Sequence, residues 1–206
     1  KSASGVSASC RITVKKAPRS ILLQRKSLTL GVGETYGMRY TLSSGSASKV
    51  IFESKQPDIA TIDETGRIEA KSPGVATIVA TTFNKKTSTC KVTVLNAPEG
   101  ISLDVAQATL GVGQVKTLTA TLSASSAGAY ALSSSNPAVA TVDGSGKLNA
   151  KSAGVAIITV QTYNGQTAQC QVTVKLAPSK VSLGKNSVTL GVGERYALEV
   201  VLGASG

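Results

Sequence analysis

Hydrophobic and polar residues alternate with a period of two along most of this chain, and Gly, Pro, Asn and Asp interrupt the alternation at short intervals. In the stretch 74–82, for example, Ala76, Ile78 and Ala80 share one parity. Successive side chains of a strand point to opposite faces, so each such stretch predicts a short strand with one buried face. We expect strands around 21–23, 28–30, 38–42, 50–52, 59–62, 68–70, 76–80 and 90–94, which is seven or eight within residues 19–98, and no helix.

The pattern recurs at a fixed interval of 80 residues. Leu-Gly-Val-Gly begins at residues 30, 110 and 190, and two glycines after an apolar run predict a strand that ends in a turn. The segment 10–18 aligns with 90–98 and with 170–178, and each of the three runs from a Cys to an Ala-Pro pair. The chain is therefore an array of copies of one unit.

This alignment predicts how the chain is divided. We expect 1–18 to be the last strand of a preceding copy, and 19–98 and 99–178 to be complete copies of an Ig-like repeat. Residues 179–206 then begin a further repeat and stop after its second or third strand. On this division the 206 residues are a segment of a longer array, so a secretory signal could lie upstream.

Many short strands with turns between them predict an all-β fold. Two antiparallel sheets packed face to face would bury one face of every strand, so we expect tandem immunoglobulin-like β-sandwiches of about 80 residues, end to end. A closed barrel is the alternative, because alternation does not determine strand order. The inward residues of the strand 38–42 and of its later copies are Met38, Tyr40 and Leu42, then Leu118, Ala120 and Leu122, then Leu198, Val200 and Leu202.

The last hairpin of each copy turns at Asn84-Lys85 or at Asn164-Gly165. Asn-Gly favours a two-residue turn, because both of its turn residues need positive φ. Lys85 fits that conformation less well than glycine does. We therefore expect a looser tip or a longer loop in the first copy.

Several runs of the chain closely resemble the bacterial immunoglobulin-like domain, group 2. They are 135–147, 150–160 and 170–174 in the second copy, and 56–63, 74–78 and 89–94 in the first. The resemblance implies tandem extracellular modules of bacterial surface proteins such as adhesins, secreted enzymes and phage structural proteins, with no catalytic residues to transfer. The family often has Trp where Phe52 and Leu132 stand, which implies a lighter core here.

The formal net charge of +11 is unevenly spread, since nine of these charges fall within residues 1–98. A basic face for an anionic partner, such as a wall polymer, an acidic glycan or nucleic acid, is one interpretation. Lys and Arg that protect edge strands from aggregation are the other. With few aromatic residues and no recognisable binding module, we expect no nucleic-acid partner.

Candidate chemistry is sparse. Cys10, Cys90 and Cys170 stand one per copy, too far apart for disulfides, and the parity of the latter two predicts buried free thiols; Cys10 could be exposed. Asp63-Glu64 could be half of a calcium site, but the second copy offers only Asp143, so a turn is expected. Without His or a repeated carboxylate pair, we expect no catalytic residue, no metal and no cofactor.

Exposed aromatic residues beside lysines could contact a ligand. Phe83 and Tyr163 lie at the hairpin tips, with Lys85 and Lys86 beside the first, and these four residues are the candidate ligand contacts. Tyr36 and Tyr196, after the Gly-Val-Gly turn, are further candidates for stacking on sugar rings. A place at the rim of the core would explain all of these aromatic residues equally well.

Ala-Pro pairs end at residues 18, 98 and 178, where one copy meets the next. Proline fixes its own φ and restricts the residue before it, so we expect a semi-rigid rod.

Three functions are compatible with the sequence: a non-catalytic stalk or adhesion module of a bacterial surface protein, a binding module for glycan or anionic wall polymer through the basic first copy, or a phage virion or filament component. Expected partners are the neighbouring Ig-like repeats and host or wall glycans or proteins.

The expected location is extracellular, at the cell surface or secreted, or alternatively in a virion. No apolar run approaches the roughly 18 residues that cross a membrane, so this segment is not expected to span one.

Overall fold

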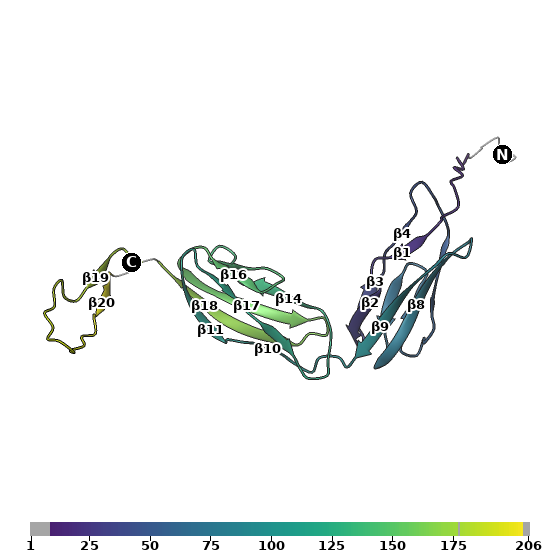
Figure 1. Ribbon diagram of the computed structural model, residues 1–206. Coiled ribbons are helices and arrows are strands. Elements are labelled where there is room, and N and C mark those ends of the chain that lie inside the picture. Colours follow the sequence, from purple (N-terminus) through teal and green to yellow (C-terminus); the bar gives the residue numbers. More distant parts are fainter. Residues whose placement is uncertain (1–8, 177, 204–206) are drawn as a thin grey trace, which may run out of the picture. The chain divides into compact units, whose positions relative to one another are not determined.

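The computed structural model describes residues 9–176 and 178–203, all of whose regular elements are strands (Figure 1). The chain divides into two compact units. Unit 1 extends to Ala97 and also takes in Ser125–Gly128, and unit 2 comprises Pro98–Ala124 and the residues from Ala129 onward.

Each unit contains one complete set of nine strands. In unit 1 these are β1 (Ile21–Leu23), β2 (Ser27–Gly31), β3 (Thr35–Gly37), β4 (Tyr40–Leu42), β5 (Val50–Ser54), β6 (Ala60–Ile62), β7 (Arg67–Ala70), β8 (Gly74–Thr82) and β9 (Thr87–Leu95). In unit 2 the counterparts, each 80 residues further along, are β10 (Ile101–Leu103), β11 (Gln107–Gly111), β12 (Val115–Thr117), β13 (Ala120–Leu122), β14 (Tyr130–Ser134), β15 (Ala140–Val142), β16 (Lys147–Ala150), β17 (Gly154–Thr162) and β18 (Thr167–Lys175).

The strands of unit 1 form a four-stranded sheet (β2-β9-β8-β5), a three-stranded sheet (β3-β7-β6) and a two-stranded sheet (β1-β4). Unit 2 repeats this order. All pairs are antiparallel except β2 with β9 and β11 with β18, which are parallel. Although β2 directly follows β1 in the chain, it joins a different sheet and lies along the last strand of the unit, β9.

One hydrophobic core lies between the sheets of each unit. In unit 1, Ile78 and Val92 of the four-stranded sheet and Ile68 of the three-stranded sheet are completely buried in the same cluster. Facing sheets with a common core are the immunoglobulin-like β-sandwich that the alternation predicts, and the separate sheets exclude a closed barrel. Each fully buried large aliphatic side chain contributes about 1.5–3 kcal/mol.

The expected strand 38–42 is shorter than predicted, and an unexpected strand, β3, precedes it in a different sheet. The stretch 38–42 forms only β4, while β3 ends at Gly37 and pairs with β7. Met38 lies between them, 3% exposed, and its amide donates to the Gly66 carbonyl at 2.8 Å. Nine strands replace the expected seven or eight, because alternation continues unbroken where the backbone changes sheets.

The prediction that Tyr40 points into the core is wrong. Its side chain is 39% exposed and meets Phe52 edge-on, with ring centroids 5.9 Å apart. The ring therefore lies at the rim of the core, because β4 pairs only with the short β1 at the margin of the sandwich.

The prediction of a looser tip or a longer loop in the first copy is wrong. In both copies a three-residue loop follows Thr82 or Thr162, whose carbonyl accepts the amide of Lys85 or Gly165 at 3.0 Å. Lys85 takes φ 63° and Gly165 takes φ 90°, and these are the left-handed residues of their loops. A type I turn followed by one left-handed residue needs positive φ at a single position, so lysine adopts it at modest cost.

The ends of the chain are less complete than the two units. Residues 9–15 form no strand, and Ile12 and Val14 are exposed, so their place in a preceding repeat stays a prediction. Further along, β19 (Val181–Leu183) pairs with β20 (Val200–Leu202) as β1 pairs with β4. Leu198, Val200 and Leu202, expected inward, are more than half exposed, because residues equivalent to β5–β9 are not among these 206.

Candidate functional site

The Leu-Gly-Val-Gly repeat is a closed turn. Gly33 takes φ 83°, and the Glu34 amide donates to the Gly31 carbonyl at 3.0 Å. The buried Glu34 carboxylate accepts the Gly31 amide at 3.0 Å, and the Gly33 amide donates to Ala70. These amides have partners within the turn and its neighbouring strand, so the two glycines make a turn and are not arranged as a phosphate cradle.

Sequence reasoning missed the residue that closes this turn. Gln114 accepts the Gly111 amide through Oε1 at 2.7 Å, and Glu194 accepts the Gly191 amide at 2.8 Å. The signal was available, since Glu, Gln and Glu follow the three Gly-Val-Gly runs. A neutral amide serves as well as a carboxylate, so the role is structural.

Asp63 begins the turn between β6 and β7. Its Oδ1 accepts hydrogen bonds from the Thr65 amide, the Thr65 hydroxyl and the Arg67 amide at 2.9, 2.6 and 2.9 Å. The Thr65 hydroxyl, followed by the Arg67 amide, lowers the pKa of Asp63. Asp143 has the same arrangement with Ser145 and Lys147.

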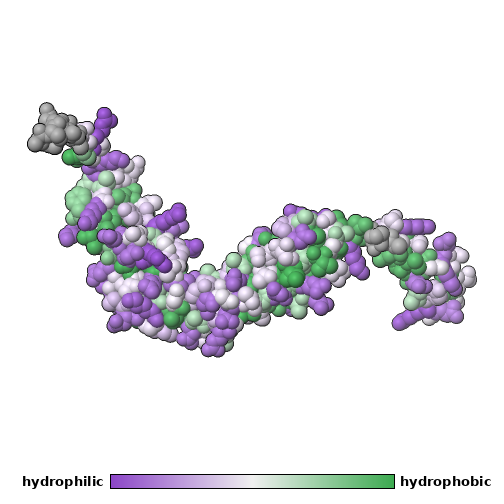
Figure 2. All heavy atoms as spheres, turned by 180° about the vertical axis from the view of Figure 1, so that it is seen from behind, coloured by the Kyte–Doolittle hydropathy of each residue, from purple (hydrophilic) through white to green (hydrophobic). Residues whose placement is uncertain are grey.

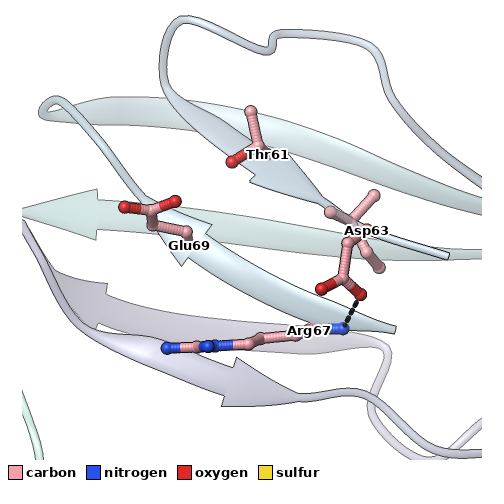
Figure 3. A pocket seen from close by; sticks show the side chains of 5 residues that line it. Thr61, Asp63, Arg67 and Glu69 are labelled. Atoms are coloured by element: carbon pink, nitrogen blue, oxygen red, sulfur yellow. Dashed lines mark hydrogen bonds between the residues drawn. The ribbon is translucent and has the colours of Figure 1, made fainter. Parts of the chain in front are cut away.

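A shallow hollow of about 250 Å³ lies beside this turn, lined by Thr61, Ile62, Asp63, Arg67 and Glu69. Figure 3 shows the Asp63 carboxylate directed at the Arg67 backbone amide, with Glu69 further along the same strand. One of the two carboxylates is thus committed to the turn. Within the described ranges, no group of three or more His, Cys, Asp or Glu side chains could hold a metal ion.

The candidate ligand contacts lie at the hairpin tips. Phe83 is 61% exposed, and Lys85 and Lys86 beside it are exposed. Tyr163, in the equivalent place of unit 2, is only half-buried and its amide donates to the Ala129 carbonyl at 3.0 Å. The aromatic ring and the lysines therefore occur together only in unit 1, and their contact with a ligand stays a prediction.

A hydrogen-bonded clamp at each hairpin tip was not foreseen. Asn84 donates from Nδ2 to the Pro18 carbonyl at 2.8 Å and accepts the Thr82 hydroxyl at Oδ1 at 2.8 Å. Asn164 makes the same bonds with Pro98 and Thr162, at 2.8 and 2.6 Å. The repeated Thr-x-Asn was a sequence signal, but its target 66 residues upstream is a tertiary contact.

The predicted burial of two of the three cysteines is confirmed. Cys90 and Cys170 are completely buried free thiols, and Cys10 is exposed. Burial raises the pKa of Cys90 and is the main cause that raises that of Cys170. A buried thiol with a raised pKa is a poor nucleophile.

We expect one of the three thiols to react rapidly with an aromatic disulfide reagent at pH 8. Mass spectrometry of the digested protein should locate the modification at Cys10, and the other two should react only in denaturant. A Cys10→Ser variant should lose the fast phase. A fast reaction at Cys90 or Cys170 in the folded chain would contradict the burial.

Two family models match the chain. The bacterial Ig-like domain (group 2) matches residues 13–94, and the intimin immunoglobulin-like domain matches residues 113–163. An uncharacterized protein of Clostridium acetobutylicum is 29% identical over 179 residues, which cover 83% of this chain and 18% of that protein. The chain thus spans less than a fifth of the length of this relative.

Several solved structures share weaker similarity. Domains 1–6 of the surface layer protein SbsC are 19% identical, with a TM-score of 0.36, over 82% of this chain and 30% of that one. A C-terminal fragment of intimin in complex with the intimin-binding domain of its receptor is 18% identical, with a TM-score of 0.33, over 80% and 67%. Such scores do not establish a shared arrangement of domains.

No helix long and apolar enough to span a membrane occurs in residues 9–176 or 178–203.

Proposed function

We infer the function from two observations: residues 13–94 match the model of the bacterial Ig-like domain (group 2), and the chain is built of β-sandwich units of Ig-like arrangement. From this we propose that the chain is a non-catalytic spacer, a stiff segment of a stalk in the extracellular part of a bacterial surface protein. It would hold another part of the polypeptide away from its point of attachment, with the neighbouring Ig-like repeats as its first partners.

This proposal depends on one observation: each unit binds the peptide that leads into its first strand through a buried proline and a hydrogen bond. Pro18 and Pro98 are fully buried, and the Asn84 and Asn164 side chains hold their carbonyl oxygens. Proline already restricts the residue before it. Because the Pro98 peptide is fixed in this way, only Asn96 and Ala97 separate it from Leu95, where β9 ends.

The surface location rests on the family and on the named contexts of similar proteins. The matched models are of bacterial and intimin Ig-like domains, and surface layer and intimin structures are among the similar chains. The intimin structure contains a receptor domain bound to intimin, which is a property of that protein. Adhesion by this chain would require a ligand surface of its own.

Small-angle X-ray scattering of the chain tests the stalk. We expect a narrow distribution of distances between the two units, and a broader one for Asn164→Asp, which keeps the acceptor for Thr162 but turns an oxygen toward the Pro98 carbonyl. Asn186→Ala, a change at an exposed asparagine outside the clamp, should match the parent.

Two results would contradict the proposal in different ways. A broad distribution for the parent would mean that the chain is a flexible string. If the parent has a narrow distribution and Asn164→Asp leaves it unchanged, the Asn164 hydrogen bond to Pro98 does not cause the stiffness.

A further inference from the structure

Three loops meet at one end of unit 1. The incoming peptide 15–19 lies against the loop 43–49, where the Ala47 amide donates to the Lys16 carbonyl at 3.2 Å and the Arg19 amide donates to the Ser43 hydroxyl at 2.9 Å. The hairpin tip 83–86 joins them. The Phe83 amide donates to the Ser48 hydroxyl at 3.1 Å, and Asn84 holds the Pro18 carbonyl. Segments far apart in the sequence thus form one surface, which we term the basic loop end.

The basic loop end carries six cations and no carboxylate. The three loops contain no Asp or Glu, and their cations are Lys15, Lys16, Arg19, Lys49, Lys85 and Lys86. All six residues are exposed. In the part of the chain that the structure describes, the one salt bridge, Lys55 with Glu53, lies outside these loops. The cations therefore repel one another without local compensation.

The surface is hollowed between the cations. A depression of about 350 Å³ is lined by Lys16, Ala17, Arg19, Ser43, Ser44 and Ser46. It offers an ammonium, a guanidinium and the Ser44 hydroxyl to a bound anion, while the Ser43 and Ser46 hydroxyls are hydrogen-bonded to each other. Phe83, 61% exposed, stands on the hairpin tip that borders the same loops and presents an apolar ring.

The second copy of the sequence shows that the fold does not need these cations. At the equivalent positions stand Leu95, Asn96, Glu99, Ala129, Gly165 and Gln166. The backbone contacts are nevertheless kept, since the Glu99 amide donates to the Ser123 hydroxyl at 3.0 Å and Asn164 donates to the Pro98 carbonyl at 2.8 Å. The Phe83 amide bond to Ser48 is replaced by one from Tyr163 to the Ala129 carbonyl, so the loops still pack without the six cations. Six cations that the sandwich can lose point to a role outside the fold.

We propose that the basic loop end of unit 1 binds an anionic glycan. Its lysines and Arg19 pair with the phosphate, sulfate or carboxylate groups along the polymer, and the hollow with Lys16 and Arg19 receives one such group. The Phe83 ring packs against the apolar face of a sugar, as aromatic side chains do at binding surfaces. Anionic polymers place charges at regular intervals, which suits cations spread over three loops better than a single small anion does. This binding is independent of the stalk role.

The test uses the 206-residue chain and two matched polymers, dextran sulfate and uncharged dextran, in sedimentation or surface-binding measurements at 50 and 300 mM salt. We expect the chain to bind dextran sulfate, to bind it more weakly at the higher salt, and to leave dextran unbound. Polyglycerol phosphate and chondroitin sulfate then separate a wall source of the anionic groups from a host source.

Two variants with equal charge loss locate the site. The first, Lys16→Asn, Lys49→Ala, Lys85→Gly and Lys86→Gln, introduces into the basic loop end the residues that stand 80 positions further along. The control, Lys26→Ala, Arg39→Thr, Lys55→Ser and Lys91→Gln, does the same elsewhere in unit 1. We expect the first to lose about tenfold or more in affinity and the control to stay near the parent. Phe83→Ala should lower the affinity for dextran sulfate at both salt concentrations.

Several outcomes would overturn the proposal. These are no binding of any anionic polymer by the parent at 50 mM salt, equal losses in the two variants, or single-stranded DNA that binds as tightly as a glycan of the same charge. Each variant is checked by its unfolding midpoint. We expect the two fourfold variants to match the parent, because their substitutions already occur in the second copy of the fold.

Discussion

Gly146→Ala is expected to destabilise unit 2 by about 3 kcal/mol or more. Gly146 takes φ 83°, where a side chain is strained, and a Cβ there would overlap the Leu118 carbonyl oxygen. The Leu118 amide donates to the Gly146 carbonyl at 2.9 Å, so the two backbones cannot separate without breaking this bond. Leu118 is itself 2% exposed, and its displacement would open the core.

A second glycine separates steric overlap from backbone strain. Gly113 also takes φ 83°, but a Cβ there would meet nothing within 4 Å. Gly113→Ala should therefore cost only the left-handed penalty, about 1–2 kcal/mol. Urea unfolding of the two variants measures both costs. Equal losses would show that the turn before β16 can move away from Leu118, contrary to its close contact.

Ile158→Ala is expected to lower the unfolding free energy of unit 2 by about 3 kcal/mol. Ile158 is completely buried in β17, facing the core with Ala156 and Val160. Removal of three carbons leaves a cavity that the surrounding strands can only partly fill. For a domain of this size the loss corresponds to a shift of about 15 °C in Tm.

The neighbouring residue provides the control. Ile157 stands one position earlier in the same strand and is 40% exposed on the outer face. Ile157→Ala changes the same atoms and should cost about 1 kcal/mol or less. Amide hydrogen exchange measures the stability of the two units separately. We expect the amides of unit 1 to keep the same protection in both variants. A loss at Ile157 as large as at Ile158 would contradict the facing of β17.

The strand faces could be predicted because they depend on a local pattern. Ile78, Cys90 and Val92 share their parity with buried neighbours, and all three are completely buried. The change of sheet between β3 and β4 was missed, since Met38 and Leu42 keep the same parity on both sides of it. Phe83, Lys85 and Lys86 are exposed at a hairpin tip as predicted, and their contact with a ligand stays a prediction. Sequence reasoning did not connect Arg19, Lys16 and Lys49 with them, because these residues come from other loops.

The sequence by itself determined the immunoglobulin-like class of each unit, the 80-residue recurrence of its strands and the burial of Cys90 and Cys170. Each of these follows from residues close together in the chain or from comparison of two copies. Only the tertiary structure decided the parallel pairing of β2 with β9, the clamp of Asn84 on Pro18 and the meeting of three cationic loops. These contacts join residues between 24 and 66 positions apart. They depend on how the strands are ordered in the sheets, and alternation carries no information on that order.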